Sequence, residues 1–406
     1  MTSASPSSAM PSSAVQRRLI DVDGPKLGHI PSFDGLRGIF IIQVVLYHAE
    51  VTTSLLTGSP ILIDWFFVAS GFLITSLLLD EVHRSGSIGL RRFYKRRALR
   101  LFPAMYAMIA VFTVLFFLAR TLSPEVTEET PHWYLEPISA ALYCYNIVAA
   151  FFPATMGVLG YLWSLAVEEQ FYFLWPPMLR RVLRDGSRRR DLWMIGGCVA
   201  FIAVFFSLRY GLQSVVQSST STGEPTFADK DAITWQGVTY RIACTRPDVI
   251  VLGCLAAFVV KKVPRPVPAH ISKWLGRAAI FAWLWFAGVI IFCKPGPPGM
   301  LAMFGGPVYQ IGLLLLPVMI VDGYLRKDTW YSRLASIRPA RWLGVRIYGI
   351  YVWHGIVLLV CAPAILAQPG LQAKIIGTFA SVLAIGAGIL SYRFLERPFL
   401  RRASKI

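Results

Sequence analysis

Charged residues are scarce in this 406-residue chain: they make up 15% of it, against about 25% in a typical soluble domain. Hydrophobic residues account for 55%, and the mean hydropathy is +0.55. So little charge excludes an ordinary soluble globular protein. The composition instead predicts a chain that lies mostly in lipid.

Cysteine provides neither a disulfide framework nor a metal site. The six cysteines form no CxxC motif and no Cys/His spacing typical of metal ligands. Cys244 and Cys254 would lie about 15 Å apart along one helix, which is too far for a disulfide. We therefore predict no metal, and we interpret the cysteines as small apolar packing residues.

The first 30 residues lack the apolar run of about 7–15 residues that a signal peptide needs. They are rich in Ser, Ala and Pro, so we predict a disordered cytoplasmic tail over 1–30. The membrane domain is then 31–400, followed by a short basic cytoplasmic tail over 401–406. The chain shows no solenoid repeat and no separate soluble domain.

Apolar runs of about 20 residues, long enough to span a bilayer as a helix, recur along the chain. Ten such runs predict an all-α integral membrane protein. The apolar stretch 138–153 is either a re-entrant or interfacial helix or an extension of the fourth span. The ten runs lie near 34–54, 60–80, 102–120, 155–180, 192–210, 244–262, 274–293, 301–322, 343–363 and 372–393.

The positive charge indicates an orientation rather than a nucleic-acid partner. The net charge is +18, and 33 of the 40 Lys and Arg residues lie in the two terminal segments and every second loop between spans. Under the positive-inside rule those segments belong in the cytoplasm. We therefore expect both termini inside, in a multi-pass protein of the plasma (inner) membrane.

The first span contains Arg37 and His48, eleven residues apart in PSFDGLRGIFIIQVVLYHAE. On a helix they lie within roughly 20° of one face and about 16 Å apart along the axis. Ionisable residues inside a membrane often mark a reaction site. The alternatives are a snorkelling anchor for Arg37 and a packing role for His48.

Two further segments suggest a path by which a ligand could reach the helix face that carries Arg37 and His48. Ser70 and Gly71 are small, so either another helix or an extended ligand could approach them closely. The following segment, RRFYKRRALRLFP, contains more cations than orientation requires, and such groups suit phosphates. The alternative is ordinary positive-inside charge. Its six cations are Arg91, Arg92, Lys95, Arg96, Arg97 and Arg100.

Glu168 and Glu169 lie inside the apolar fourth span, YLWSLAVEEQFYFLW. They point about 100° apart, so only one can face a given site directly. One could orient His48, and the other could pair with Arg37, Arg241 or Arg246. Arg246 and Asp248, two residues apart in TRPDVIVLG, do not face each other and are expected to pair with other helices.

Together the motifs resemble acyltransferase family 3, membrane enzymes that modify bacterial glycans and glycolipids. The matching strings are FDGLRG, DWFFVASGFLIT, FYKRRALRLFP, YLWSLAVEEQFYFLWP, TRPDVIVLG, IYGIYVWHG and SYRFLERPF, in family order over about 31–400. Two local departures are Ala69 in the second string and the sequence IYGIYVWH in the sixth. Because the chain stops at Ile406, without a hydrolase-like domain that some members carry, transfer would be completed in the membrane domain.

The resemblance implies catalytic roles for Arg37, His48, Glu168 and Glu169. It also implies an acyl donor, usually acetyl-CoA, held by the six cations together with Ser70 and Gly71. We expect Trp163, Tyr172, Tyr351 and His354 to bind substrate. His48 would act as general base, or would form an acyl-histidine intermediate.

The expected acceptor is a hydroxyl of an envelope glycan or glycolipid, such as a trehalose lipid; a macrolide-type small molecule is an alternative. The competing function is a non-enzymatic transporter or exporter of a glycan or lipid. Transporters often show repeated halves with broken helices, and no matching half-repeat is present. The partners expected on either reading are the bilayer and the glycan or lipid, and not nucleic acid.

Overall fold

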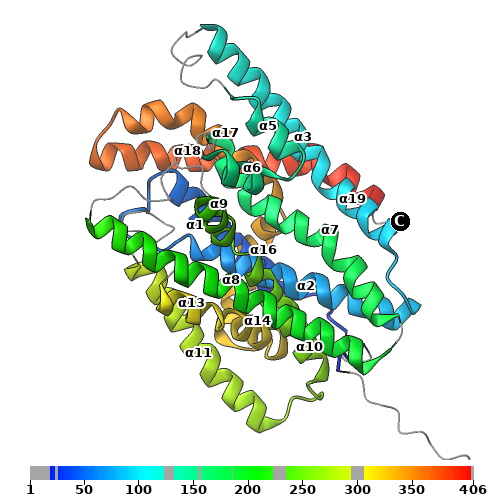
Figure 1. Cartoon of the computed structure of the whole chain (residues 1–406). Coiled ribbons are helices and arrows are strands. Elements are labelled where there is room, and N and C mark those ends of the chain that lie inside the picture. Colours follow the sequence, from blue (N-terminus) through cyan, green and yellow to red (C-terminus); the bar gives the residue numbers. More distant parts are fainter. Residues whose placement is uncertain are drawn as a thin grey trace, which may run out of the picture.

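The computed structural model describes residues 19–22, 26–122, 132–153, 157–184, 186–222, 235–293 and 306–403. Within these residues the secondary structure is helical and contains no strand. The long helices run in a common direction and form one bundle (Figure 1). This confirms the expected all-α membrane architecture. Residues 1–18, 23–25 and 404–406 of the two expected tails lie outside the described part.

The first half of the chain contains the helices from Pro31 to Thr222. They are α1 (Pro31–His48), α2 (Ile61–Ser85), α3 (Leu90–Leu122), α5 (Leu135–Ala141), α6 (Tyr145–Phe151), η2 (Val158–Leu162), α7 (Trp163–Leu183) and α8 (Arg188–Thr222).

The second half contains more short helices, which connect the long ones. They are α9 (Trp235–Cys244), α10 (Pro247–Lys262), α11 (Ala269–Phe292), α13 (Pro307–Leu313), α14 (Leu316–Leu325), α15 (Trp330–Ala335), α16 (Arg338–Gly344), α17 (Ile347–Leu366), α18 (Gly370–Ser391), η3 (Tyr392–Glu396) and α19 (Arg397–Ala403).

Eight of the described helical segments are long and apolar enough to cross a membrane. The other two expected spans form α1 and α7, which carry the ionisable residues and are too polar to be counted on composition alone. Many apolar side chains of α8, α11 and α18 are exposed, as lipid-facing side chains are. The eight crossings are thus supported, and the crossings by α1 and α7 stay a prediction.

Several expected boundaries differ from the structure. The first span ends at His48 rather than residue 54, because residues 49–60 form turns that include Glu50 at φ 60°. The eighth span is broken into α13 and α14, since Pro317 has no N–H to bond the carbonyl of Leu313. The stretch 138–153 falls in the separate short helices α5 and α6 and does not lengthen α7.

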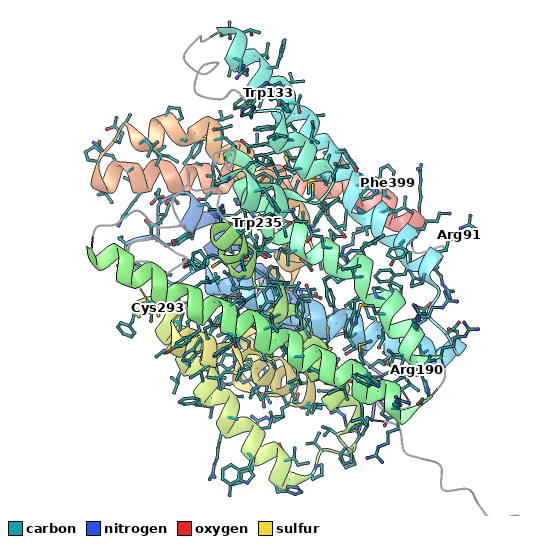
Figure 2. The ribbon with its side chains drawn as sticks, in the orientation of Figure 1. Arg91, Trp133, Arg190, Trp235, Cys293 and Phe399 are labelled. Atoms are coloured by element: carbon teal, nitrogen blue, oxygen red, sulfur yellow. The ribbon has the colours of Figure 1, made fainter. Side chains whose placement is uncertain are left out.

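Cations of two segments predicted to be cytoplasmic lie at the same end of the bundle, and the side of the membrane that this end faces stays a prediction. Arg91 and Arg190, from two segments predicted to be cytoplasmic, lie at one end of the bundle, and Cys293 lies toward the other (Figure 2). At the first end the chain just before Pro31 contacts the bundle. The N–H groups of Leu19 and Ile20 donate to Asp191, at 2.8 and 2.9 Å, and Leu27 N donates to Asp80 at 2.9 Å.

Close packing between α2 and α10 depends on two glycines. A Cβ atom at Gly71 would collide with the carbonyl of Ile250, and one at Gly253 would collide with the carbonyl of Val68. Small residues allow helix backbones to approach in this way within membranes. Gly71 therefore takes part in helix packing, and its expected role in binding a donor stays a prediction.

Two hydrophobic clusters of the bundle meet at Trp163 and Tyr351. One is built mainly from α1, α2, α10 and α14, and the other from α3, α5, α6 and α17. Trp163 and Tyr351 pack against both clusters. The polar residues of the candidate site lie between these two clusters, and the packed helices on both sides can hold them in position.

Candidate active site

A cavity of about 280 Å³ lies between α1, α2, α3, α7 and α17. Its apolar walls include Phe66 and Phe67 of α2, and polar side chains enter it from all five helices. Those polar side chains are Arg37, Ser70, Arg97, Arg100, Ser164, Glu168, Tyr172, Tyr348 and Tyr351. A mostly apolar cavity with a few converging polar groups is the usual form of a ligand site.

Glu168 is the carboxylate of this cavity. Its Oε1 accepts hydrogen bonds from Ser70 Oγ and Tyr172 Oη, each at 2.5 Å. Tyr172 lies four residues after Glu168 on α7, so the side chains of Glu168 and Tyr172 share one face of the helix. Arg37 of α1 and Arg100 of α3 line the same cavity. The cavity thus contains an anion and a cation in the same small volume.

Glu169 points to a different partner, as the ~100° separation of adjacent residues on a helix requires. It forms a two-point ion pair with Arg97 of α3, whose Nε lies 2.7 Å from Oε2 and whose Nη2 donates to Oε1. The Arg97 guanidinium also lies 3.3 Å from the centre of the Tyr172 ring. The expected pairing of a glutamate with Arg37, Arg241 or Arg246 is therefore wrong for Glu169.

A larger, positively charged pocket lies beside this cavity. This basic vestibule, of about 620 Å³, lies between α2 and α3 and is lined by Arg84, Arg92, Arg96, Arg97 and Arg100. Arg97 and Arg100 line both spaces, so the vestibule and the cavity share a wall.

The six cations predicted to act together do not all face the vestibule. They belong to the first turns of α3 rather than to a loop, and the helical period separates them. Arg91 and Lys95 line a different groove, together with Arg180 of α7; Arg92 borders both spaces. Arg92 also pairs with Glu81 at 3.1 Å. Arg91 and Lys95 therefore do not line the vestibule, and their expected role in binding the donor stays a prediction.

His48 lies at the other end of α1 from Arg37 and does not line the cavity. Its side chain is exposed, and its Nδ1 lies 3.2 Å from Nε2 of His354 on α17. Neither glutamate is the partner of this imidazole, because Glu168 and Glu169 are engaged on α2, α3 and α7 as described above. The expected Glu–His48 contact is therefore replaced by a contact between two histidines.

Tyr351 separates the cavity from the two histidines. Its hydroxyl donates to the Tyr161 carbonyl at 2.5 Å and contacts Ser164 Oγ at 2.6 Å. Because a tyrosine hydroxyl has one proton, Ser164 is the donor in the second contact. The Tyr351 ring lines the cavity on one side, and its centre is 5.4 Å from that of His354 on the other.

Two of the expected substrate-binding residues do not line the cavity. Trp163 packs edge-to-face against Phe67, at 6.0 Å between ring centres, and lies 5.2 Å from the Arg246 guanidinium. His354 contacts His48 instead. Tyr172 and Tyr351 do line the cavity, as does Ser70.

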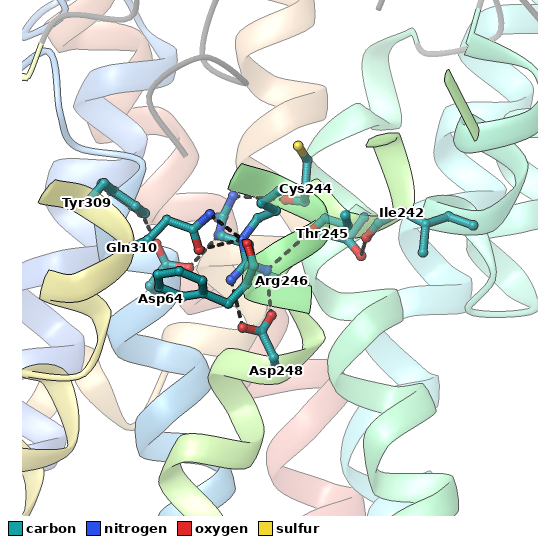
Figure 3. Close-up of polar contacts among 11 residues, drawn as sticks. Asp64, Ile242, Cys244, Thr245, Arg246, Asp248, Tyr309 and Gln310 are labelled. Carbon is teal, nitrogen blue, oxygen red and sulfur yellow. Dashed lines mark hydrogen bonds and ion pairs between the residues drawn. The ribbon is translucent and has the colours of Figure 1, made fainter. Parts of the chain in front are cut away.

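A buried ion-pair network includes Asp64, Arg246 and Asp248 (Figure 3). Arg246 Nε bonds Asp64 Oδ1 at 2.5 Å, and Arg209 bonds both oxygens of Asp248 at 2.6 and 2.7 Å. All four side chains are at most 2% exposed. The prediction that Arg246 and Asp248 pair with other helices is confirmed. These pairs tie α10 to α2 and α8.

Sequence reasoning missed several of these groups. Asp64 and Arg209 received no role, although an unpaired charge in an apolar span is costly and so predicts a partner. Tyr309, which donates to Asp64, and Gln310, which accepts from Arg209 Nε at 3.1 Å, were also missed. Ser164 could have been found, because it lies four residues before Glu168 and therefore on the same helix face.

Comparison with known proteins gives a family for the chain as a whole. A family model described as an acyltransferase domain matches residues 30–393. The peptidoglycan O-acetyltransferase OatA of Listeria monocytogenes is 29% identical over 382 residues, which cover 91% of this chain and 56% of the relative. The O-acetyltransferase OatA of Staphylococcus aureus is 29% identical over 401 residues, covering 96% and 60%.

The chain thus spans less than two thirds of the length of these curated relatives. No solved structure matches it.

Proposed function

Because the chain belongs to this acyltransferase family, we propose that it is a membrane O-acyltransferase that transfers an acyl group, most simply acetyl, from acyl-CoA to a hydroxyl of a cell-envelope glycan. The observation that carries this proposal is the basic vestibule, which adjoins a cavity containing Arg37 and Glu168.

The residues of the vestibule fit the donor. CoA carries several phosphates on its nucleotide end and a long, uncharged pantetheine arm. Arginine is well suited to phosphate because its planar guanidinium can donate two parallel hydrogen bonds. Arg92, Arg96 and Arg100 would hold the nucleotide end, and the narrower cavity would receive the arm. Ser70 and Tyr172, already bonded to Glu168, would line its route.

The chemistry assigned to His48 is general-base catalysis. The acceptor oxygen attacks the thioester carbon while its proton passes to His48, the carbon–sulfur bond breaks, and the departing thiolate takes up the proton. His48 is exposed at the end of α1 opposite Arg37, so an acceptor could reach it from the opposite side to the donor. Attack by the His48 nitrogen itself, to give an acyl-histidine, is the alternative covalent route.

The acceptor class rests on the relatives. The Listeria protein is named a peptidoglycan O-acetyltransferase, so a cell-wall glycan is the first acceptor to test. A glycolipid such as a trehalose lipid, or a macrolide-type small molecule, offers the same hydroxyl chemistry. The plasma membrane is the proposed location, because such an enzyme must receive acyl-CoA on one side and an envelope acceptor on the other.

The test is transfer of radiolabelled acetyl from acetyl-CoA, using membranes that contain the wild-type chain, His48→Ala or His270→Ala, with envelope extract supplied. His270 is an exposed histidine of α11 and serves as the matched control. We expect label in a glycan or lipid fraction with the wild type and the control but not with His48→Ala. Near-normal transfer by correctly inserted His48→Ala would refute the role of His48. The labelled fraction identifies the acceptor class.

A further inference from the structure

His354 of α17 is only 1% exposed, so its two ring nitrogens need hydrogen-bond partners within the protein. Its Nδ1 lies 2.5 Å from the backbone carbonyl of Tyr351, and its Nε2 lies 3.2 Å from Nδ1 of His48. The two imidazole rings have centres 5.1 Å apart. Residues 306 positions apart in the sequence are therefore joined by a direct contact between ring nitrogens.

The direction of these hydrogen bonds follows from the atoms involved. A carbonyl oxygen only accepts, so the proton of His354 must be on Nδ1. A second proton on Nε2 would make His354 a cation at a position that is 1% exposed, which is costly, so Nε2 carries a lone pair. His48 Nδ1 must then be the donor, and a neutral imidazole with its proton on Nδ1 has its free lone pair on Nε2.

We propose that His354 is a positioning residue, which holds His48 in the tautomer whose Nε2 lone pair accepts the proton of the acceptor hydroxyl. This inference rests on the proposed function of His48 as a base. When Nε2 takes up that proton, Nδ1–H still donates to His354, so the ring keeps its orientation through the reaction. In serine hydrolases a carboxylate has this orienting role; here a neutral imidazole takes it.

His354 is itself held in place by η2. The Tyr161 ring lies edge-on to the imidazole, with 4.6 Å between ring centres, and its hydroxyl donates to the Val352 carbonyl at 2.7 Å. This approach requires Gly355, because a Cβ atom there would collide with the Tyr161 ring. His354 consequently has little freedom to turn its Nε2 away from His48.

The kinetic test compares His354→Gln with His354→Phe. The glutamine side chain has a carbonyl oxygen that can still accept from His48, whereas phenylalanine keeps the bulk of the ring but has no acceptor. We expect His354→Phe to lower kcat by roughly 10- to 100-fold, the loss typical when the hydrogen-bond partner that orients a metal-ligating histidine is removed. The KM for acetyl-CoA should not change. His354→Gln should retain most of the activity, and equal losses in both variants would overturn the proposal.

A spectroscopic test does not depend on activity. In wild-type protein labelled with ¹⁵N-histidine, the His48 signals are identified by their absence from His48→Ala, and their shifts report which nitrogen carries the proton. We expect a protonated Nδ1 and an unprotonated Nε2. A protonated Nε2 in the resting protein would overturn the proposal, even if the His354 variants do not fold.

The two tests separate this inference from the proposed function. If His48→Ala retains transfer, the role of His48 as base is wrong, whereas the tautomer result still shows whether His354 orients it. If His48→Ala is inactive and the spectra show the opposite tautomer, only the positioning role fails.

Discussion

Arg97 of α3 and Glu169 of α7 form a two-point ion pair at the boundary between the basic vestibule and the inner cavity. The side chains are only 20% and 12% exposed. The pair therefore does two things: it neutralises a carboxylate inside the bundle, and it holds an arginine in the wall that both spaces share.

Arg97→Ala should destabilise the protein, because it leaves Glu169 charged and unpaired. Removing one member of a buried ion pair typically costs about 3–5 kcal/mol, and the partial exposure here places the expected loss near the lower end. Thermal melting in detergent should show this loss. The double variant Arg97→Met/Glu169→Met should recover much of the stability, and a double variant as unstable as Arg97→Ala would contradict the explanation.

The cations of α3 should differ in their effect on the donor. Arg96 lines the vestibule, whereas its neighbour Lys95 lines the separate groove. Arg96→Ala should raise the KM for acetyl-CoA by about tenfold, since a hydrogen bond to a charged group is worth about 1.5–3 kcal/mol. Lys95→Ala is the matched control and should leave KM nearly unchanged. Equal effects of the two substitutions would place the nucleotide elsewhere.

Ser70 and Gly71 are adjacent, yet their substitution should have opposite consequences. Gly71→Ala places a methyl group against the Ile250 carbonyl, and such overpacking typically costs 1–3 kcal/mol. Ser70→Ala removes a donor to Glu168 without adding volume, so the protein should fold while transfer changes. Melting temperature and transfer rate, measured on both variants, check this. A fully stable Gly71→Ala protein would show that α2 and α10 can separate.

Glu136 of α5, which lies outside the candidate spans, should make stability depend on pH. Its carboxylate is 7% exposed and accepts from Leu159 N at 2.8 Å, and burial raises its pKa from 4.5 to about 7. The folded state therefore holds a proton that the unfolded state releases above about pH 4.5. Stability should fall as pH rises from about 4.5 to about 7, by on the order of 3 kcal/mol, and then level off.

The variant Glu136→Gln tests that dependence, because an amide oxygen can still accept from Leu159 N and does not titrate. Melting curves of the variant and the wild type should nearly coincide at pH 5 and should favour the variant at pH 8. The reverse order, with the wild type more stable at pH 8, would mean that Glu136 is held as a carboxylate by its hydrogen bonds.

The sequence by itself determined the membrane class and the positions of most helices, because long apolar runs can satisfy their backbone groups in lipid only as helices. It also placed Arg37 and His48 near one face of a helix, about 16 Å apart along its axis, and directed Glu168 and Glu169 to different sides, since both results follow from helix geometry alone. Breaks that depend on local chemistry, at Glu50 and Pro317, were not anticipated.

Only the tertiary structure decided which side chains meet. The partner of His48 is 306 residues away, and the partner of Glu169 is 72 residues away on α3. Helical periodicity gives the direction in which a side chain leaves its own helix, but it carries no information about which other helix faces it. Which helices pack together depends on glycines such as Gly71, which allow two backbones to approach closely, and on ion pairs between buried charges of different helices.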